Sequence, residues 1–349
     1  MRSKRSDGQS AGGLGELELL RQIRSRAAQS SRGGLRLGIG DDCALLAPRD
    51  GEELAVTTDL SIAGRHFRLD WHAPEAVGHR ALARGLSDLA AMGARPVAAF
   101  LSLGLPRELT QAAGRRPAWV QGFLDGLMAL AEAHKTPLAG GDLAESPLAL
   151  ADIVLVGAVP RGKALLRCGA RAGDLLYVTG VLGGAAAGLA RLAELAGTPG
   201  RIQAGPAQPP RIPKKLAALL APHLYPQPRI AQGLWLRGRG LASAALDLSD
   251  GLSTDLAHLC QESGVAAEVE AARLPLHPGA TLAQALNGGE DYELLFAASA
   301  SARIPRSIGG VAVTRIGRMV KARSGQPVVT LITAQGPRPL DARGWEHFS

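Results

Sequence analysis

Hydrophobic residues recur at helical spacing in several long stretches of the chain. In residues 74–92, Leu82, Leu86 and Leu89 follow this spacing, a proline opens the segment and Gly93 follows it. A period near 3.6 between a proline and a glycine predicts an amphipathic helix. The same spacing predicts further helices over residues 15–26, 119–133, 183–195 and 252–260.

Short apolar runs bounded by Gly, Asp and Pro fill most of the remaining chain. Such runs are typical of β-strands. They predict strands over residues 35–39, 54–58, 97–105, 153–159, 174–179, 246–248, 292–297 and 311–316. Because helices and strands do not alternate strictly, the order favours an α/β chain of the α+β kind over a regular βαβ repeat.

The chain length predicts two domains. Single cores rarely grow to 349 residues, and a new strand and helix unit begins after Gly162. We therefore expect an N-terminal domain over residues 14–160 and a C-terminal domain over 161–349. Residues 1–13 are polar, Gly/Ser-rich and basic, which predicts a disordered tail. Residues 197–213 are rich in Pro and Gly, which predicts a loop.

The net charge of +8 is concentrated at the N-terminus. Residues 1–36 hold eight basic and three acidic side chains, so the other 313 residues carry only +3. Aromatic residues, which stack on nucleic-acid bases, make up 3% of the chain. These features disfavour a nucleic-acid-binding protein, and we expect no nucleic-acid partner.

Cysteine content and hydropathy predict a cytoplasmic protein. Cys43, Cys168 and Cys260 are odd in number and far apart, which matches neither a disulfide framework nor a zinc motif. No apolar run reaches the length of a membrane span, and no apolar segment follows the polar start as in a signal peptide. We therefore expect a soluble protein with no membrane partner.

The candidate chemistry lies in aspartates placed beside Gly or hydroxyl residues. The P-loop pattern is absent. Instead the chain carries Gly40-Asp41-Asp42, Thr57-Thr58-Asp59, Ser87-Asp88, Gly140-Gly141-Asp142 and Asp247-Leu248-Ser249-Asp250-Gly251, which we expect mostly in turns after strands. Carboxylates are hard ligands for Mg²⁺, and a triphosphate can lie beside several of them only with divalent ions between.

Each signal also has an ordinary structural interpretation. Asp42 follows a glycine as in a common turn, and Asp88 lies four residues after Arg84, as in an exposed helix ion pair. Asp250 has the position of a helix N-cap. His66 and Glu290 are also compatible with ordinary surface positions, and Gly180–Gly184 is either a phosphate cradle or a close-packing segment.

Taken in order, eight segments resemble the thiamine-monophosphate kinase family, within the superfamily typified by aminoimidazole ribonucleotide synthetase. The segments are GIGDDCALL (38–46), TTDLSIAGRHF (57–67), LSDLAAMGARP (86–96), GGD (140–142), ALLRCGARAGDLLYVTG (164–180), LDLSDGLSTDL (246–256), GGEDYEL (288–294) and GWEHF (344–348). Together they span most of the chain.

The resemblance implies a fold, a reaction and partners. The fold is a two-domain α/β structure whose N-terminal strands form a β-barrel across a homodimer, followed by a C-terminal α/β domain. The reaction is phosphorylation of thiamine monophosphate by ATP, the last step of thiamine diphosphate synthesis, with Mg²⁺ as cofactor. We expect direct in-line transfer with no covalent nucleophile, because the acceptor phosphate oxygen is already ionised.

The resemblance also implies residue roles. The magnesium ligands would be Asp42, Thr57, Thr58, Asp59, Asp88, Asp142, Asp247 and Asp250. Gly141, Asp142, Arg167 and Ser249 would contact ATP, while His66, Glu290 and Trp345 would contact the acceptor. The physics of a cationic thiazolium and a flat aminopyrimidine agrees with a carboxylate and an indole. The alternative is a sister ATP-dependent synthetase acting on a purine precursor, an amide or selenide.

Overall fold

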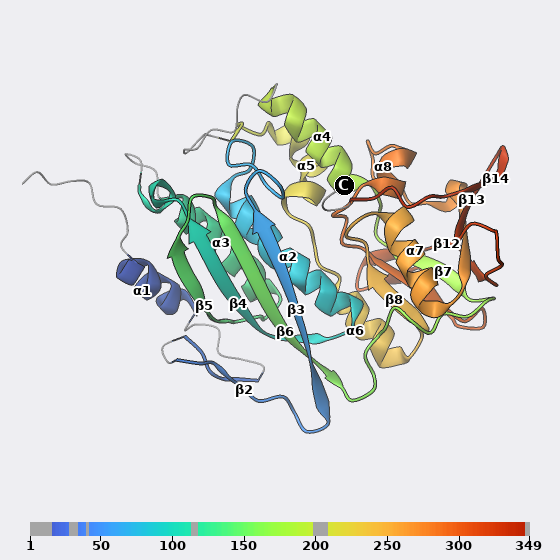
Figure 1. Cartoon of the computed structure of the whole chain (residues 1–349), viewed down its shortest axis with the longest axis horizontal. Coiled ribbons are helices and arrows are strands. Elements are labelled where there is room, and N and C mark those ends of the chain that lie inside the picture. The colour runs from blue at the N-terminus through green and yellow to red at the C-terminus, as the bar shows by residue number, and fades with distance from the viewer. Residues whose placement is uncertain (1–15, 28–33, 40–41, 113–117, 198–208, 346–349) are drawn as a thin grey trace, which may run out of the picture.

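The computed structural model describes residues 16–27, 34–39, 42–112, 118–197 and 209–345. The predicted tail and most of the 197–213 loop therefore lie outside the described residues. The N-terminal half contains a four-stranded sheet in the order β3-β6-β4-β5, with bounds Glu52–Ile62, Leu150–Pro160, Arg95–Leu105 and Leu138–Glu145. Helix α1 (Glu16–Ala27) and the small β1 (Leu35–Leu37) and β2 (Leu45–Leu46) pair lie beside this sheet (Figure 1).

Two helices, α2 (Pro74–Ala91) and α3 (Trp119–Ala133), cover one face of this sheet (Figure 1). They cross at contact distance because glycines lie at the crossing. A Cβ on Gly78 would lie 1.9 Å from the carbonyl oxygen of Phe123, and one on Gly126 would lie 1.9 Å from that of Glu75. The close crossing fixes α2, which carries polar side chains to the other half of the molecule.

The C-terminal half is built on an eight-stranded, mainly antiparallel sheet. Its order is β14-β13-β9-β12-β7-β10-β8, with β11 paired to β12. The bounds are β7 Leu175–Thr179, β8 Ala244–Asp247, β9 Ala266–Glu270, β10 Leu294–Ala298, β11 Ser307–Ile308, β12 Val311–Val320, β13 Val329–Thr333 and β14 Gly336–Pro339. The helices are α4 Gly184–Ala196, α5 Ala217–Leu224, α6 Ile230–Arg239, α7 Leu252–Ser263 and α8 Leu282–Asn287.

The hydrophobic core continues from one half into the other. One cluster of buried side chains joins Leu82 and Leu86 of α2 to Phe123 of α3 and to Phe296 of β10. Helix α2 thus lies between the two sheets, in contact with β3 and β6 on one side and with α6 and β8 on the other. Polar residues at the ends of these elements are brought to the same junction.

Most predicted elements are present, with one error that concerns the candidate site. Gly140-Gly141-Asp142 does not lie in a turn after a strand but inside β5. Gly141 has a φ of 149°, and a Cβ there would lie 1.9 Å from the carbonyl oxygen of Leu101 in the paired strand β4, so the glycines serve close strand pairing.

Two further expectations concern cysteines and membrane spans. Cys43, Cys168 and Cys260 are free thiols, as expected. Among the helices of the described residues, none is long and apolar enough to cross a membrane.

Candidate active site

A cavity of about 630 Å³ lies where the two halves meet, and we call it the acidic cavity. The N-terminal half lines it with Asp59 of β3, Asp88 of α2 and His66 of the connecting loop. Eight of the predicted site residues share this lining: Asp59, His66, Asp88, Asp247, Ser249, Asp250, Glu290 and Trp345. Residues separated by almost 290 positions in the sequence therefore face one space.

Carboxylates from three elements form the polar end of the cavity. Thr57 Oγ1 of β3 donates a hydrogen bond to Asp88 Oδ2 of α2. Ser87 Oγ, from the same helix, donates to Asp247 Oδ2 at the end of β8, at 2.6 Å. Asp59, two residues after Thr57 on the same side of β3, forms an ion pair with Arg84 at 3.3 Å.

These carboxylates raise one another's pKa. Burial, reinforced by the charge of Asp88, raises the pKa of Asp247 to about 8. Burial likewise raises the pKa of Asp59 to about 6, with Asp88 adding to the rise and Arg84 opposing it. Burial also raises the pKa of Asp88, against the hydrogen bond from Thr57. Ionised acids in this arrangement call for a cation between them.

The donor set suits Mg²⁺ bound together with phosphate. No group of three or more His, Cys, Asp or Glu side chains in the described residues forms a complete metal cluster. Magnesium usually takes one or two protein carboxylates and fills its octahedron with phosphate oxygens and water. The neighbouring Asp88 and Asp247, with Asp59 beside them, therefore fit an ion delivered with a nucleotide.

A tightly held loop carries Ser249 and Asp250 into the cavity. Asp255 of α7 accepts hydrogen bonds through Oδ2 from the backbone amides of Ser249, Asp250 and Gly251, at 3.0, 3.1 and 3.0 Å. Asp250 is not an N-cap, since Gly251 holds that position. The carbonyl oxygen of Asp250 accepts from the Trp345 amide at 3.0 Å, which fixes the indole-bearing segment to the same loop.

Replacing Asp255 with alanine is expected to destabilise the fold and to weaken nucleotide use. Three amides would lose their acceptor, which should lower the free energy of unfolding by about 2–4 kcal/mol. Because the loop positions Ser249 and Asp250, kcat/KM for ATP should fall by about tenfold. Urea unfolding and initial rates measure both effects. Asp255→Asn, which keeps one acceptor oxygen, should lose less of each, and equal losses in both variants would contradict this role.

A second loop, residues 288–293, presents Glu290. Glu290 and Tyr292 have positive φ values of 67° and 51°, which are costly for residues with a Cβ. Three anchors enforce this backbone. Asp291 accepts from the amides of Gly183 and Ala185 at 2.6 and 3.0 Å, Tyr292 is buried, and Glu293 pairs with Arg229. Within Gly180–Gly184, the amide of Gly183 donates to Asp291 and those of Gly180 and Leu182 donate to backbone carbonyls, so these amides do not form an open phosphate cradle.

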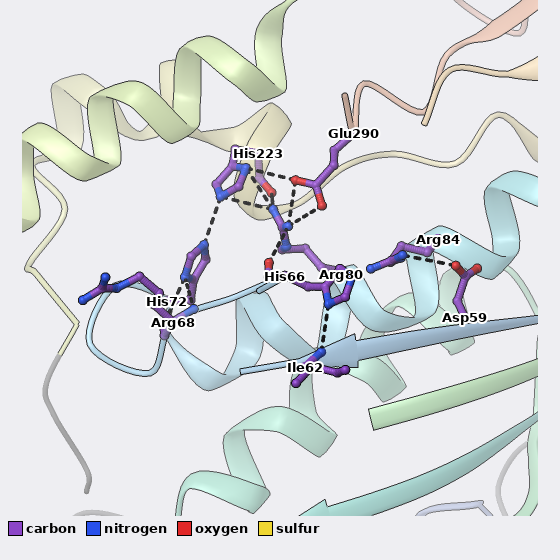
Figure 2. A network of polar contacts seen from close by, with 9 residues as sticks. All are labelled: Asp59, Ile62, His66, Arg68, His72, Arg80, Arg84, His223 and Glu290. Atoms are coloured by element: carbon purple, nitrogen blue, oxygen red, sulfur yellow. Dashed lines mark hydrogen bonds and ion pairs between the residues drawn. The ribbon is translucent and has the colours of Figure 1, made fainter. Parts of the chain in front are cut away.

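Cationic and aromatic side chains also lie in or next to the wall of the cavity. Arg84 of α2 lines the cavity, and Arg80, one turn earlier, reaches Glu290 with Nη2 at 2.7 and 2.8 Å (Figure 2). His66 Nδ1 accepts from the Ile62 amide at 3.0 Å. Trp345 borders the cavity and is 51% exposed.

Six predicted site residues do not line this cavity. Thr57 lies directly behind Asp88 through its hydrogen bond. The exposed Arg167 is near enough for its charge to lower the pKa of Asp88. Asp42 lies exposed in a bend. Gly141 and Asp142 lie in β5, and Thr58 points to the opposite face of β3 from Thr57.

The sequence prediction missed the arginines and the second-loop anchors. Arg84 forms an ion pair with Asp59 of β3 and not with Asp88 one turn along α2. The exposed Arg84–Asp88 ion pair that the spacing offered as an alternative is therefore not formed. The available signal was the four-residue spacing of Arg80, Arg84 and Asp88, which places all three on one face of a helix.

Comparisons with known proteins identify the family. Residues 40–159 match the model of the AIR synthase related protein, N-terminal domain. The chain is 40% identical over 347 residues to thiamine-monophosphate kinase of Escherichia coli strain K12, with 96% of this chain and 98% of that protein covered. The chain belongs to the thiamine-monophosphate kinase family.

Solved structures of that family have the same fold. The thiamine-monophosphate kinase of Stenotrophomonas maltophilia K279a, 37% identical, superposes with a TM-score of 0.72 over 92% of this chain and 97% of that one. AaThiL complexed with AMPPCP and TMP, 31% identical, superposes with a TM-score of 0.71 over 96% of this chain and 97% of that one. The aminoimidazole ribonucleotide synthetase-like α/β fold implied by the sequence is thereby confirmed.

Proposed function

We propose that the chain transfers the γ-phosphoryl group of ATP to thiamine monophosphate, which yields ADP and thiamine diphosphate. The observation that carries this proposal is the acidic cavity, which the carboxylates of Asp59, Asp88 and Asp247 line together with Glu290 and Trp345. The family relatives are named for this activity, and AaThiL forms a complex with AMPPCP and TMP. One end suits magnesium and a triphosphate, and the other suits a flat, cationic acceptor.

The chain's own residues act by positioning and charge. Asp59, Asp88, Asp247 and Asp250 would hold Mg²⁺ at the polar end, with Thr57 directly behind Asp88. Asp42, Thr58 and Asp142, which the resemblance also implies as ligands, lie outside this cavity. Bound Mg²⁺ supplies positive charge that offsets the repulsion between two phosphates. Ser249, Gly141 and Arg167 would contact ATP. No side chain forms a covalent bond, because an ionised phosphate oxygen is itself the nucleophile.

The residues at the acceptor end would recognise the charge and the shape of thiamine monophosphate. Trp345 offers an exposed ring for stacking on a pyrimidine or a cationic thiazolium. Glu290 offers a carboxylate to an amino group or to the positive charge. His66 would contact the acceptor phosphate, with its ring orientation set by the Ile62 amide.

A product assay tests the activity. The purified chain is incubated with ATP, Mg²⁺ and thiamine monophosphate, and the products are separated by chromatography. We expect thiamine diphosphate and ADP in equal amounts, with no product from a purine-synthesis precursor or from selenide. Turnover of either of those acceptors without turnover of thiamine monophosphate would refute the proposal in favour of a sister synthetase.

We also propose that the chain has an N-terminal domain of residues 14–160 and a C-terminal domain of residues 161–349. Two copies would pair through the face of the N-terminal sheet that lies opposite α2 and α3. On this face of β3, Leu54, Val56 and Leu60 are 45%, 61% and 45% exposed. The strand register continues this row from Leu60 through Asp152 and Ser102 to Asp142. A second copy would cover these apolar side chains and complete a barrel.

Replacing Val56 with arginine is therefore expected to give a monomer. A charge in the centre of an apolar contact face loses its hydration on association, which should weaken the dimer at least about a hundredfold. Analytical ultracentrifugation measures the mass. Leu148→Arg, at an exposed leucine outside these strands, is the control and should leave the dimer intact. A wild-type chain that sediments as a monomer would contradict the pairing.

A further inference from the structure

A single buried guanidinium connects three parts of the acceptor end. Arg80 of α2 is only 6% exposed and is not among the residues that line the acidic cavity. Its Nη2 donates to both carboxylate oxygens of Glu290 and, at 3.2 Å, to the carbonyl oxygen of His66. Its Nη1 donates to the carbonyl oxygen of His223 at 2.5 Å and to that residue's Nδ1 at 2.9 Å. Figure 2 shows Arg80 between these groups.

Beside Arg80 lies a pair of largely buried histidines that border the acidic cavity. His223 of α5 and His72 of the loop before α2 are each 2% exposed, and their Nε2 atoms lie 2.9 Å apart. Arg80 Nη1 also lies 3.2 Å from His223 Nε2. Because arginine can only donate, one ring nitrogen of His223 accepts from Arg80. His72 Nδ1 lies 3.1 Å from both the amide nitrogen and the carbonyl oxygen of Arg68.

Because Arg80 can only donate, the His223 ring must keep an acceptor nitrogen and therefore be neutral. Burial and the charge of Arg80 lower the pKa of His72 to about 4, against the opposing charges of Glu290 and Asp70. Burial, Arg80 and His72 lower the pKa of His223. A proton added to His223 would place a second ring donor beside Arg80. The histidines thus orient Arg80 without competing for the charge of Glu290.

The Glu290 side chain is 28% exposed, so its carboxylate faces the cavity while Arg80 holds it from behind. We propose that Arg80, oriented by the His223–His72 pair, is a positioning residue that fixes Glu290 and thereby sets selectivity for the cationic acceptor. This inference rests on the proposed function, in which Glu290 contacts that acceptor. Because Arg80 lies behind the acceptor end and away from the carboxylates of the polar end, it should govern acceptor use and leave nucleotide use largely unchanged.

A double-mutant cycle tests this role. Arg80→Lys keeps the charge but cannot reach Glu290, His66 and His223 together, so KM for thiamine monophosphate should rise by about tenfold while KM for ATP changes less than about twofold. In the Glu290→Gln background the same change should have almost no further effect on KM for thiamine monophosphate. The matched control is Arg95→Lys, because Arg95 of β4 also forms an ion pair, with Glu52 of β3. This change should leave both KM values unchanged. Additive effects, or equal changes in both KM values, would overturn the positioning role.

Nitrogen-15 spectra of the histidine side chains give a readout independent of turnover. The wild-type protein at pH 7 should show one protonated nitrogen on each of His72 and His223, and both rings should remain neutral at pH 6. If Arg80→Lys does not fold, His223→Gln gives the same comparison, with a smaller rise in KM for thiamine monophosphate. A charged ring at pH 6 would overturn the orienting role of the histidine pair. A wild-type protein with the expected spectra but no activity on thiamine monophosphate would refute the proposed function alone.

Discussion

Replacing Asp247 with asparagine is expected to abolish phosphoryl transfer and, without divalent ions, to stabilise the protein. Asp247 is 5% exposed, accepts a hydrogen bond from Ser87 and lies beside Asp88. Asparagine keeps the shape and the acceptor for Ser87 but removes the charge. If this carboxylate helps to hold magnesium, kcat should fall about a thousandfold.

The gain in stability follows from the direction of the pKa shift. The pKa of Asp247 rises from its ordinary value of 3.8 to about 8 in the folded protein. The unfolded chain therefore releases its proton at lower pH than the folded protein does. The wild-type free energy of unfolding should fall as pH rises from about 4 to about 8, and Asp247→Asn should flatten that fall. At pH 7 in EDTA we expect a gain of about 1–3 kcal/mol.

Urea unfolding in EDTA and initial rates in Mg²⁺ measure the two effects. Asp174→Asn is the control, because Asp174 is also buried but accepts from Ser243 and from the Arg171 amide away from the cavity. It should lose stability and keep its activity. An Asp247→Asn protein that retains more than about a tenth of wild-type kcat would contradict the metal role.

Replacing Arg84 with glutamine is expected to lower kcat by about a hundredfold or more, with a smaller effect on KM for ATP. Arg84 lines the cavity, pairs with Asp59, and is close enough to Glu290 to interact with its charge. It is thus a fixed cation between the metal ligands and the acceptor end. There it can stabilise negative charge on the group in transfer.

Steady-state kinetics with each substrate varied in turn separates these effects. Arg318→Gln, which breaks an exposed ion pair with Glu268, is the control and should be silent. An unchanged kcat with a raised KM for ATP would contradict this prediction. Arg84 would then bind the nucleotide equally well in the ground state and in the transition state.

Local patterns in the sequence predicted α1, α2, α3, α4 and α7 but not α5, α6 or α8. Helix α3 has the predicted bounds, Trp119–Ala133, and α2 ends within one residue of its prediction. The strand β5 was not predicted, because Gly140 and Gly141 break the apolar pattern on which strand prediction depends. Their role becomes visible only when β4 packs against them.

Those predicted acids whose helix or strand borders the junction of the two halves lie in one cavity. Asp88 lies on α2, and Asp59 and Asp247 lie on β3 and β8, which both pack against α2. The motifs therefore located these three acids correctly. Asp142 and Thr58 lie on the other face of the N-terminal sheet. For Thr58, the alternation of side chains along a strand was enough to predict this from the sequence. The contacts of Arg80 could not be predicted, because they depend on α5, 143 positions away, packing against α2.

The central claim is that both halves of the chain form one metal and phosphate site. Its most direct test is a crystal structure with Mn²⁺, an unhydrolysable ATP analogue and thiamine monophosphate, in which anomalous scattering locates the ions. We predict ions bound by Asp59, Asp88 and Asp247, with the γ-position of the analogue facing an acceptor phosphate between Arg84 and His66. Ions or nucleotide bound away from these carboxylates would contradict the claim.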